Sequence, residues 1–176
     1  MLPVSAVLAI GLVVVPQTPA TTRPDFSGRW AIAAAPGAAR AGGGGAGRGD
    51  MGSGWGSPIT ITQDATRLTV EYAFFSRGDM QPPLKFVYAL DGAETKNSVM
   101  LGRGTQTQTS KASWDGAKLV ITTIHTFADP ATGKPVSEEV TQTLSLESPT
   151  ALVVETTRAG VLGGAATSTK TIYQKN

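Results

Sequence analysis

The chain of 176 residues has no cysteine, one histidine and little charge. Without cysteine it has no disulfide framework, no thiolate metal ligand and no cysteine nucleophile. Charged residues make up 16% of the sequence and the net charge is +2. The basic residues are scattered, whereas a nucleic-acid-binding domain gathers them on one face. The composition therefore predicts no nucleic-acid partner.

Long hydrophobic runs are also missing from the sequence. The run at residues 4–15 is too short for a membrane-spanning helix, which needs about 20 residues. Prolines and small residues follow it up to Ala20, which predicts a secretory signal peptide over residues 1–20. A buried N-terminal strand is the alternative, because Val13–Val15 favour β-structure. We expect a periplasmic or secreted protein with no membrane span after signal removal. Because exported eukaryotic proteins commonly contain disulfides, the lack of cysteine favours a bacterial source.

Helical periodicity is the third absence, because no segment keeps a helical apolar repeat over about ten residues. From Pro58 onward, apolar and polar residues instead alternate as they do in strands with one buried face. Asp91-Gly92 and Asp115-Gly116 predict hairpins with type I′ turns, in which both central residues need positive φ. A long meander has to close or stack to protect its edges. We therefore predict an all-β fold, an antiparallel up-and-down meander that closes into a barrel of about 8–10 strands.

The mature chain has the length of one ordinary domain. We predict a single β-barrel domain over residues 21–176, with its first strand beginning near Trp30. Residues 36–56 consist mostly of Gly and Ala. Such a segment buries too little apolar surface to offset the entropy of ordering it. It is predicted to be a flexible loop.

Two short motifs suggest a family. The first strand opens with Asp-Phe-Ser-Gly-Arg-Trp at residues 25–30, which contains a Gly-x-Trp motif, and residues 170–173 read Lys-Thr-Ile-Tyr. Together with the Asp-Gly hairpins, this layout resembles exported bacterial proteins of unknown function that are described as lipocalin-like, with calycin-type barrels. The fold that the resemblance implies is a lipocalin-like barrel.

The resemblance also implies roles for residues at one end of the barrel. In the family, the Trp of Gly-x-Trp plugs the closed end, which here assigns Gly28 and Trp30 to that end. A basic side chain of the last strand packs across this Trp, and Lys170 is the candidate here, with Arg158 one strand earlier.

Patterns for catalysis and metal binding are missing. His125 is the only histidine, so a transition-metal site would rest on carboxylates alone. Glu138 and Glu139 point to opposite faces of a strand and cannot form a carboxylate pair. No Gly-x-Ser-x-Gly elbow is present, and His125 has no evident Asp partner for a Ser-His-Asp triad. We expect no enzyme, no metal and no cofactor.

The alternation of faces predicts two kinds of barrel wall. One wall is apolar and aromatic and the other is polar, which is the mixed lining that ligand pockets show. The predicted ligand-binding residues are Tyr72, Phe74, Phe86, Tyr88, Gln108, His125 and Gln142. The alternative is that these side chains simply fill the barrel, as they do in small closed barrels. For His125, this alternative is a hydrogen-bonded histidine of the core or rim.

Two functions follow from these alternatives. A hollow barrel predicts a binding module that holds a small amphipathic or hydrophobic ligand. A filled barrel predicts an envelope structural or protein-interaction module, including a protease inhibitor, that acts through the loop at 36–56 with Trp55 exposed to a protein partner.

Overall fold

The computed structural model describes residues 22–33, 55, 57–72, 84–101, 104–128, 132–160 and 164–176. The predicted signal peptide, most of the predicted loop at 36–56 and Phe74 lie outside these ranges. All regular elements within them are β-strands. In the same part of the chain, no helix is long and apolar enough to cross a membrane.

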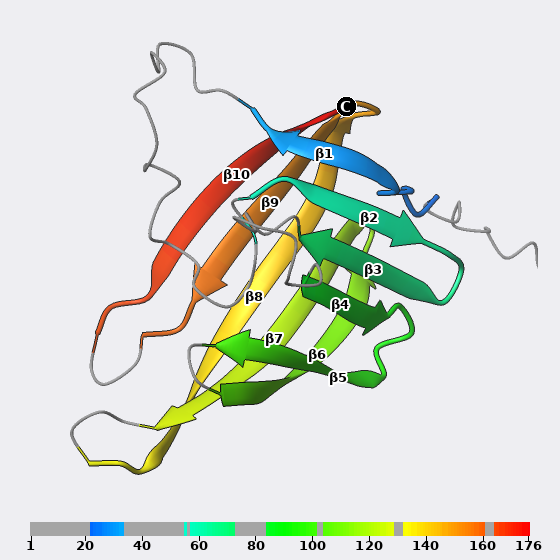
Figure 1. The fold of residues 1–176 in the computed structure, drawn as a ribbon. Helices are drawn as coiled ribbons and strands as arrows, with labels where there is room; N and C mark the ends of the chain where they lie inside the picture. Colours follow the sequence, from blue (N-terminus) through cyan, green and yellow to red (C-terminus); the bar gives the residue numbers. More distant parts are fainter. Residues whose placement is uncertain are drawn as a thin grey trace, which may run out of the picture.

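Within these ranges, ten strands form one sheet, as predicted. They are β1 (Gly28–Ile32), β2 (Ile59–Gln63), β3 (Arg67–Tyr72), β4 (Leu84–Ala89), β5 (Glu94–Leu101), β6 (Gly104–Asp115), β7 (Lys118–Ala128), β8 (Pro135–Ser148), β9 (Ala151–Arg158) and β10 (Thr167–Lys175). The strand order is β4-β3-β2-β1-β10-β9-β8-β7-β6-β5, and every pair is antiparallel. The sheet curls into a nearly closed barrel (Figure 1), which confirms the predicted fold class.

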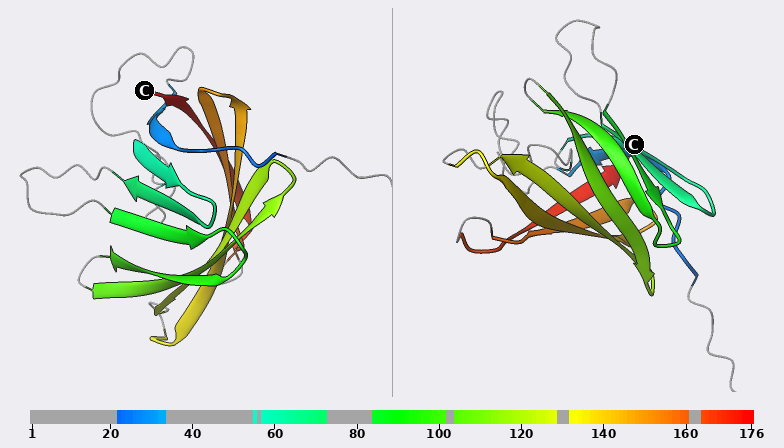
Figure 2. Two further views of the ribbon diagram at one scale, coloured as in Figure 1. Left: turned by 90° about the vertical axis from the view of Figure 1, so that its right-hand side faces the viewer. Right: turned by 90° about the horizontal axis from the view of Figure 1, so that it is seen from below.

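The two halves of the barrel differ in strand length. Strands β1 to β4 have five or six residues, whereas β6, β7 and β8 have 11 to 14. The short strands cross in front of the long ones in Figure 1, and Figure 2 shows how the sheet wraps around the space between them. The long strands therefore carry inward-facing residues well beyond the last layer of the short strands.

The core follows the period of two that the sequence predicts. In β3, the buried residues alternate with partly exposed ones, and Leu68, Val70 and Tyr72 face inward. Phe86 and Tyr88 of β4 do the same. Because one contiguous apolar cluster joins residues from both halves of the barrel, this interior is the main source of the hydrophobic stabilisation.

The first Asp-Gly turn does not form the predicted hairpin. It lies in the four-residue connection from Leu90 to Ala93, and Gly92 has a φ of 84°. The strands that it joins, β4 and β5, are the two edges of the sheet, and their described residues form no backbone ladder with each other. We call this junction the seam. The prediction was wrong here because Asp-Gly chemistry specifies a local turn, while the pairing of the flanking strands depends on the whole barrel.

The second Asp-Gly turn forms a hairpin one residue out of the predicted position. Asp115 pairs with Lys118, so the two-residue loop is Gly116-Ala117. Gly116 has a φ of 58° and stands at the first central position of the loop. A glycine at that position suits the mirror-image turns that match strand twist. The hairpin prediction is confirmed, and its central residues are corrected.

Candidate functional site

One end of the barrel is sealed by the residues that precede β1. Phe26 stacks on Trp114 of β6 with ring centroids 5.9 Å apart, and the Trp30 Nε1–H donates to the Phe26 carbonyl at 2.9 Å. The Gln63 carboxamide accepts from the Phe26 N–H and donates to the Pro24 carbonyl, both at 3.0 Å. These bonds hold the segment across the opening, and we call this the closed end.

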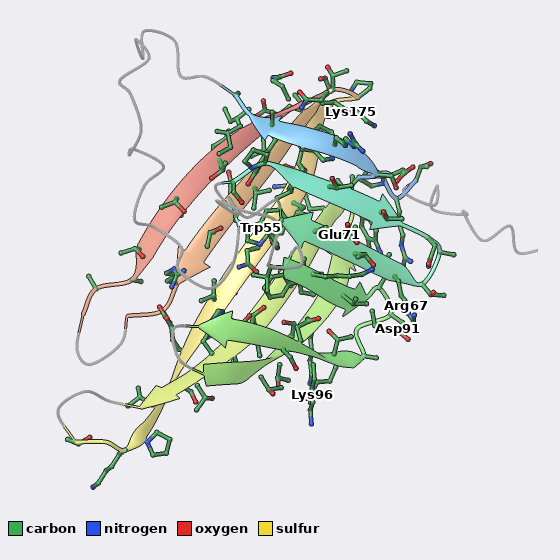
Figure 3. All side chains as sticks on the ribbon, in the orientation of Figure 1. Trp55, Arg67, Glu71, Asp91, Lys96 and Lys175 are labelled. Carbon is green, nitrogen blue, oxygen red and sulfur yellow. The ribbon has the colours of Figure 1, made fainter. Side chains whose placement is uncertain are left out.

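Lys175 covers Trp30 at the closed end, and Lys170 does not. The Nζ of Lys175 lies 5.3 Å from the centre of the Trp30 ring, and the two residues are register partners in β1 and β10. Figure 3 shows Lys175 where these strands meet. Lys170 instead pairs with Glu147 at 3.2 Å on the exposed surface. The assignment of Lys170 is corrected because residues five apart on a strand face opposite sides of the sheet.

Gly28 makes room for this lysine. Its φ is +149°, and a Cβ at this position would stand 2.5 Å from Lys175 Cε. A larger residue would displace the lysine from its place beside the Trp30 ring. The glycine and the tryptophan of the Gly-x-Trp motif thus have one shared partner, Lys175.

An aromatic cluster fills the middle of the barrel. It consists of Trp55, Tyr72, Phe86, Tyr88 and Tyr173, joined by edge-to-face contacts and one stacked pair, with ring centroids 5.3 to 6.5 Å apart. Burial in the apolar interior raises the pKa of the Tyr72 phenol well above its usual value, and the nearby Tyr88 and Tyr173 raise it further. Burial also raises the pKa of Tyr88. Both phenols are therefore neutral hydrogen-bonding groups.

Trp55 is buried rather than exposed. Only 5% of its surface is accessible, and its ring contacts Tyr72 of β3 and Tyr173 of β10. Figure 3 shows it between the short and the long strands. The expectation of an exposed Trp55 is wrong because its indole packs against aromatic rings of the barrel interior, where burial of a large apolar ring is favourable. Because residues 36–56 are mostly Gly and Ala, their composition does not predict a buried tryptophan.

A polar wall lines the interior at the other end of the long strands. It consists of Gln108, Ser110, Thr123, His125, Gln142 and Thr156, all buried. Two pairs within it face each other across β6 and β7: Gln108 Nε2 lies 3.2 Å from His125 Nδ1, and the hydroxyls of Ser110 and Thr123 are 2.9 Å apart. Four of the six residues of the polar wall are therefore joined in cross-strand pairs.

Some buried polar atoms of the interior have no hydrogen-bond partner among the described residues. They are Tyr72 Oη, His125 Nε2, Gln142 Oε1, Trp55 Nε1 and Trp114 Nε1. Gln142 is 2% exposed and His125 8%. Burial of a polar group without a partner costs about 1–3 kcal/mol, so most such groups in proteins are paired. Tyr72, His125, Gln142 and Trp55 are all buried, so these unpaired atoms lie in the interior of the barrel.

The charged groups nearest the polar wall neutralise one another. Arg158 Nη1 lies 3.5 Å from Glu138 Oε2, and Glu138 is the register partner of His125. Burial raises the pKa of Glu138 and lowers that of Arg158, so their contact does not offset the loss of hydration. Burial also lowers the pKa of His125, which keeps its imidazole neutral at pH 7. The imidazole of the polar wall is therefore neutral at pH 7, and the charged residues Glu138 and Arg158 contact each other.

The structure brings together most of the predicted ligand-binding residues. Tyr72, Phe86 and Tyr88 belong to the aromatic cluster, and Gln108, His125 and Gln142 belong to the polar wall. Sequence reasoning missed Trp55, Tyr173 and Asn97 as buried residues. The alternation of inward-facing and outward-facing residues that identified Tyr72 could also have identified Tyr173, which occupies an inward-facing position of β10.

Neither a metal-binding cluster in the described ranges nor a similar known protein points to a function. Within the described ranges, no cluster of three or more His, Cys, Asp or Glu side chains is placed to hold a metal ion. No protein-family model, no curated protein and no solved structure matches the chain.

Proposed function

We propose that the protein is an exported, lipocalin-like carrier that binds a small amphipathic molecule inside its barrel. The proposed export rests on the sequence of residues 1–20. The lipocalin-like assignment draws support from the nearly closed antiparallel barrel and from the arrangement of Gly28, Trp30 and Lys175 at the closed end.

The observation that carries this proposal is a gradient of polarity along the barrel. On β6, β7 and β9, the inward residues change from apolar to polar in the same direction, away from the closed end, whereas on β8 apolar and polar inward residues alternate. The series are Trp114, Ala112, Ser110 and Gln108 on β6; Leu119, Ile121, Thr123 and His125 on β7; and Leu152, Val154, Thr156 and Arg158 on β9. On β8, Gln142 lies between the apolar Leu144 and Val140, with Glu138 beyond Val140. A ligand with an apolar body and a polar group matches such a lining.

A barrel filled only for stability does not need this gradient. Polar side chains in a packed core cost free energy unless every group is hydrogen-bonded. His125 Nε2 and Gln142 Oε1 lack partners among the described residues, and polar groups of a bound ligand would supply such partners. The alternative function, a protein interaction through the loop at 36–56, relied on an exposed Trp55. Trp55 is instead buried inside the barrel, so this alternative loses that support.

Binding of N-phenyl-1-naphthylamine, whose fluorescence rises in apolar surroundings, tests the proposal. Two substitutions of the same residue type on β9 form a matched pair: Thr156→Phe fills the interior, and Thr157→Phe adds the ring on the exposed face. We expect saturable binding by the native chain and by Thr157→Phe, with loss of binding in Thr156→Phe. Equal binding by both variants, or no binding by the native chain, contradicts the proposal.

A second pair protects the test from misfolding. If Thr156→Phe does not fold, Ser110→Met introduces a smaller obstacle at a buried position, and Ser113→Met is its exposed counterpart on β6. The same difference in probe binding is expected, with the fold of each variant checked by circular dichroism.

A further inference from the structure

Strand β10 runs past the end of its neighbour β1. The register between them stops at Tyr173, whereas β10 pairs with β9 from Thr167 onward (Figure 1). Among the described residues, positions 167–171 of β10 therefore pair on one side only, and we call them the free edge. We propose that the free edge pairs with the free edge of a second copy of this chain, which gives a symmetric antiparallel dimer. This inference goes beyond the proposed function and does not depend on a ligand.

The direction of the backbone groups follows from the contact between β1 and β10. The Ala33 N–H donates to the Ile172 carbonyl at 2.8 Å, so the backbone of Ile172 faces β1. In an antiparallel strand, every second residue presents its N–H and C=O to the same neighbour. Ser168 and Lys170 therefore direct these groups to the free edge, where no other described residue bonds to them.

The free edge is accessible to a second strand. Its residues Thr167, Ser168, Thr169 and Lys170 are all exposed, although they alternate between the two faces of the sheet. Threonine, which favours β-structure, occupies every other position. A strand edge with unpaired N–H and C=O groups is a template for pairing with another chain.

Geometry and charge select one register for the dimer. Residues that exchange hydrogen bonds must both face the edge, so Ser168 and Lys170 are the available partners. With Lys170 opposite its own copy, two like charges would meet and destabilise the pair. With Ser168 opposite its own copy, Lys170 would face Ala166, which lies outside β10.

The remaining register places Ser168 of one copy opposite Lys170 of the other. Each of the two pairs exchanges hydrogen bonds through both residues, and Thr169 stands opposite its own copy on the two-fold axis. Thr169 is also the midpoint of the free edge, so the register uses its full length. Cross-strand Thr–Thr pairs are favourable in sheets. The free edge is therefore complementary to itself.

The charge of Lys170 does not oppose this pairing. Lysine on an edge strand can deter association, but the Lys170 Nζ lies 3.2 Å from Glu147 Oε1 of the same chain. Its partner in the dimer, Ser168, is uncharged. The ammonium group therefore keeps its counter-ion when the second strand is added.

A second copy matches this edge better than the sequence that follows β1 does. Residues 34–46 consist of Ala and Gly apart from Pro36 and Arg40. Ala, Gly and Pro are depleted in strands, whereas Thr is enriched. Because one short strand pair buries little surface, the dimer belongs to the class of weak and transient interfaces. We expect exchange between monomer and dimer at high protein concentration.

Disulfide trapping tests the register. The chain has no cysteine, so one introduced cysteine per chain reports on contact between copies. In the dimer, the two copies of residue 169 form a non-hydrogen-bonded pair with Cα atoms about 4.5 Å apart, which is within the range for a disulfide. Thr167→Cys is the control, because residue 167 is exposed on the same face and stands opposite Thr171 of the other copy.

The expected result is faster cross-linking at the two-fold axis. With copper phenanthroline as the oxidant, Thr169→Cys should form the disulfide-linked dimer at least about tenfold faster than Thr167→Cys. A mixture of Thr167→Cys and Thr171→Cys should give the mixed dimer faster than either variant cross-links alone. Equal rates for Thr169→Cys and Thr167→Cys overturn the inference.

Amide hydrogen exchange of the native chain tests the inference without a variant. The exchange of the Ser168 and Lys170 amides should slow as the protein concentration rises, whereas the Thr169 amide, which faces β9, should not respond. Fast exchange of both edge amides at every concentration overturns the inference. Slow exchange that is independent of concentration means that the chain covers its own edge, which also overturns it. Probe binding tests the proposed function separately from all of these outcomes.

Discussion

Across the seam, the side chain of Asn97 forms the two hydrogen bonds with the Val87 backbone that a paired strand would otherwise form. Its Oδ1 accepts from the Val87 N–H at 2.8 Å, and its Nδ2 donates to the Val87 carbonyl at 3.0 Å. Asn97 is buried on β5 and Val87 lies on β4, the opposite edge of the sheet. One carboxamide thus satisfies a donor and an acceptor of the edge strand, and it holds the barrel closed where the strands do not pair.

Replacement of Asn97 tests how far the seam depends on this residue. Asn97→Leu keeps the size of the side chain and removes both hydrogen bonds, so we expect the free energy of unfolding to fall by about 1–3 kcal/mol. Ser98→Ala, at an exposed position of the same strand, is the control and should change it by less than about 0.5 kcal/mol. Urea denaturation measures both values. Equal stabilities of the two variants would show that the seam closes without Asn97.

The closed end allows a test of the corrected lysine. A double-mutant cycle of Lys175→Met with Trp30→Leu is expected to give a coupling free energy of about 0.5–1 kcal/mol, the usual size of an exposed cation–π contact. The same cycle with Lys170→Met should give about zero, because Lys170 pairs with Glu147 on the other face of β10. Coupling of Trp30 to Lys170 would contradict the structure at this end.

Because their phenols are buried, Tyr72 and Tyr88 are expected to ionise only at a pH well above that of an exposed tyrosine. The chain has three tyrosines, and burial raises the pKa of both Tyr72 and Tyr88. In a Tyr173→Phe variant, the tyrosinate absorbance at 295 nm should therefore stay flat to about pH 11 while the protein is folded. The same variant in denaturant should titrate near pH 10. A folded variant that gains tyrosinate absorbance near pH 10 would exclude a sealed aromatic cluster.

The neutral His125 predicts a loss of stability in mild acid. Its pKa in the folded state is below the ordinary value of 6.5, so the unfolded chain binds the proton first as the pH falls. Stability from this residue is present above about pH 6.5 and is lost below it, by at most about 1.4 kcal/mol per pH unit. Urea denaturation of the native chain and of His125→Gln at about pH 7.5 and about pH 5.5 measures this effect.

Protonation of Glu138 changes the stability of the fold in the opposite direction, and it does so over a lower pH range. Its pKa is raised above 4.5 by burial, so the folded state binds a proton before the unfolded chain does and gains stability as the pH falls toward 4.5. The native chain and His125→Gln both contain Glu138, and the difference between them isolates the histidine. An identical pH dependence of the two proteins would mean that the imidazole is not held neutral.

The sequence was sufficient to predict the strands and much of the barrel lining, because both depend on a local period of two. Tyr72, Phe86 and His125 were found by that rule and are buried. The rule also explains Lys175, which lies on the same phase as Tyr173, whereas Lys170 lies on the opposite phase.

Other features depend on which strands meet, and local patterns do not contain that information. Asn97 is a polar residue in a polar strand, and only the closing of β5 toward β4 turns it into a buried bridge. Trp55 follows a Gly-rich segment that predicts flexibility, and its burial depends on Tyr72 and Tyr173, which come from distant strands.

Native mass spectrometry of the full-length gene product, purified gently from its own host, tests the central claim most directly. The account predicts a population that carries one additional small molecule, which is lost on denaturation and proves to be amphipathic. A bare protein mass under these conditions, together with failure to bind N-phenyl-1-naphthylamine, would contradict the account and would identify the barrel as a filled one.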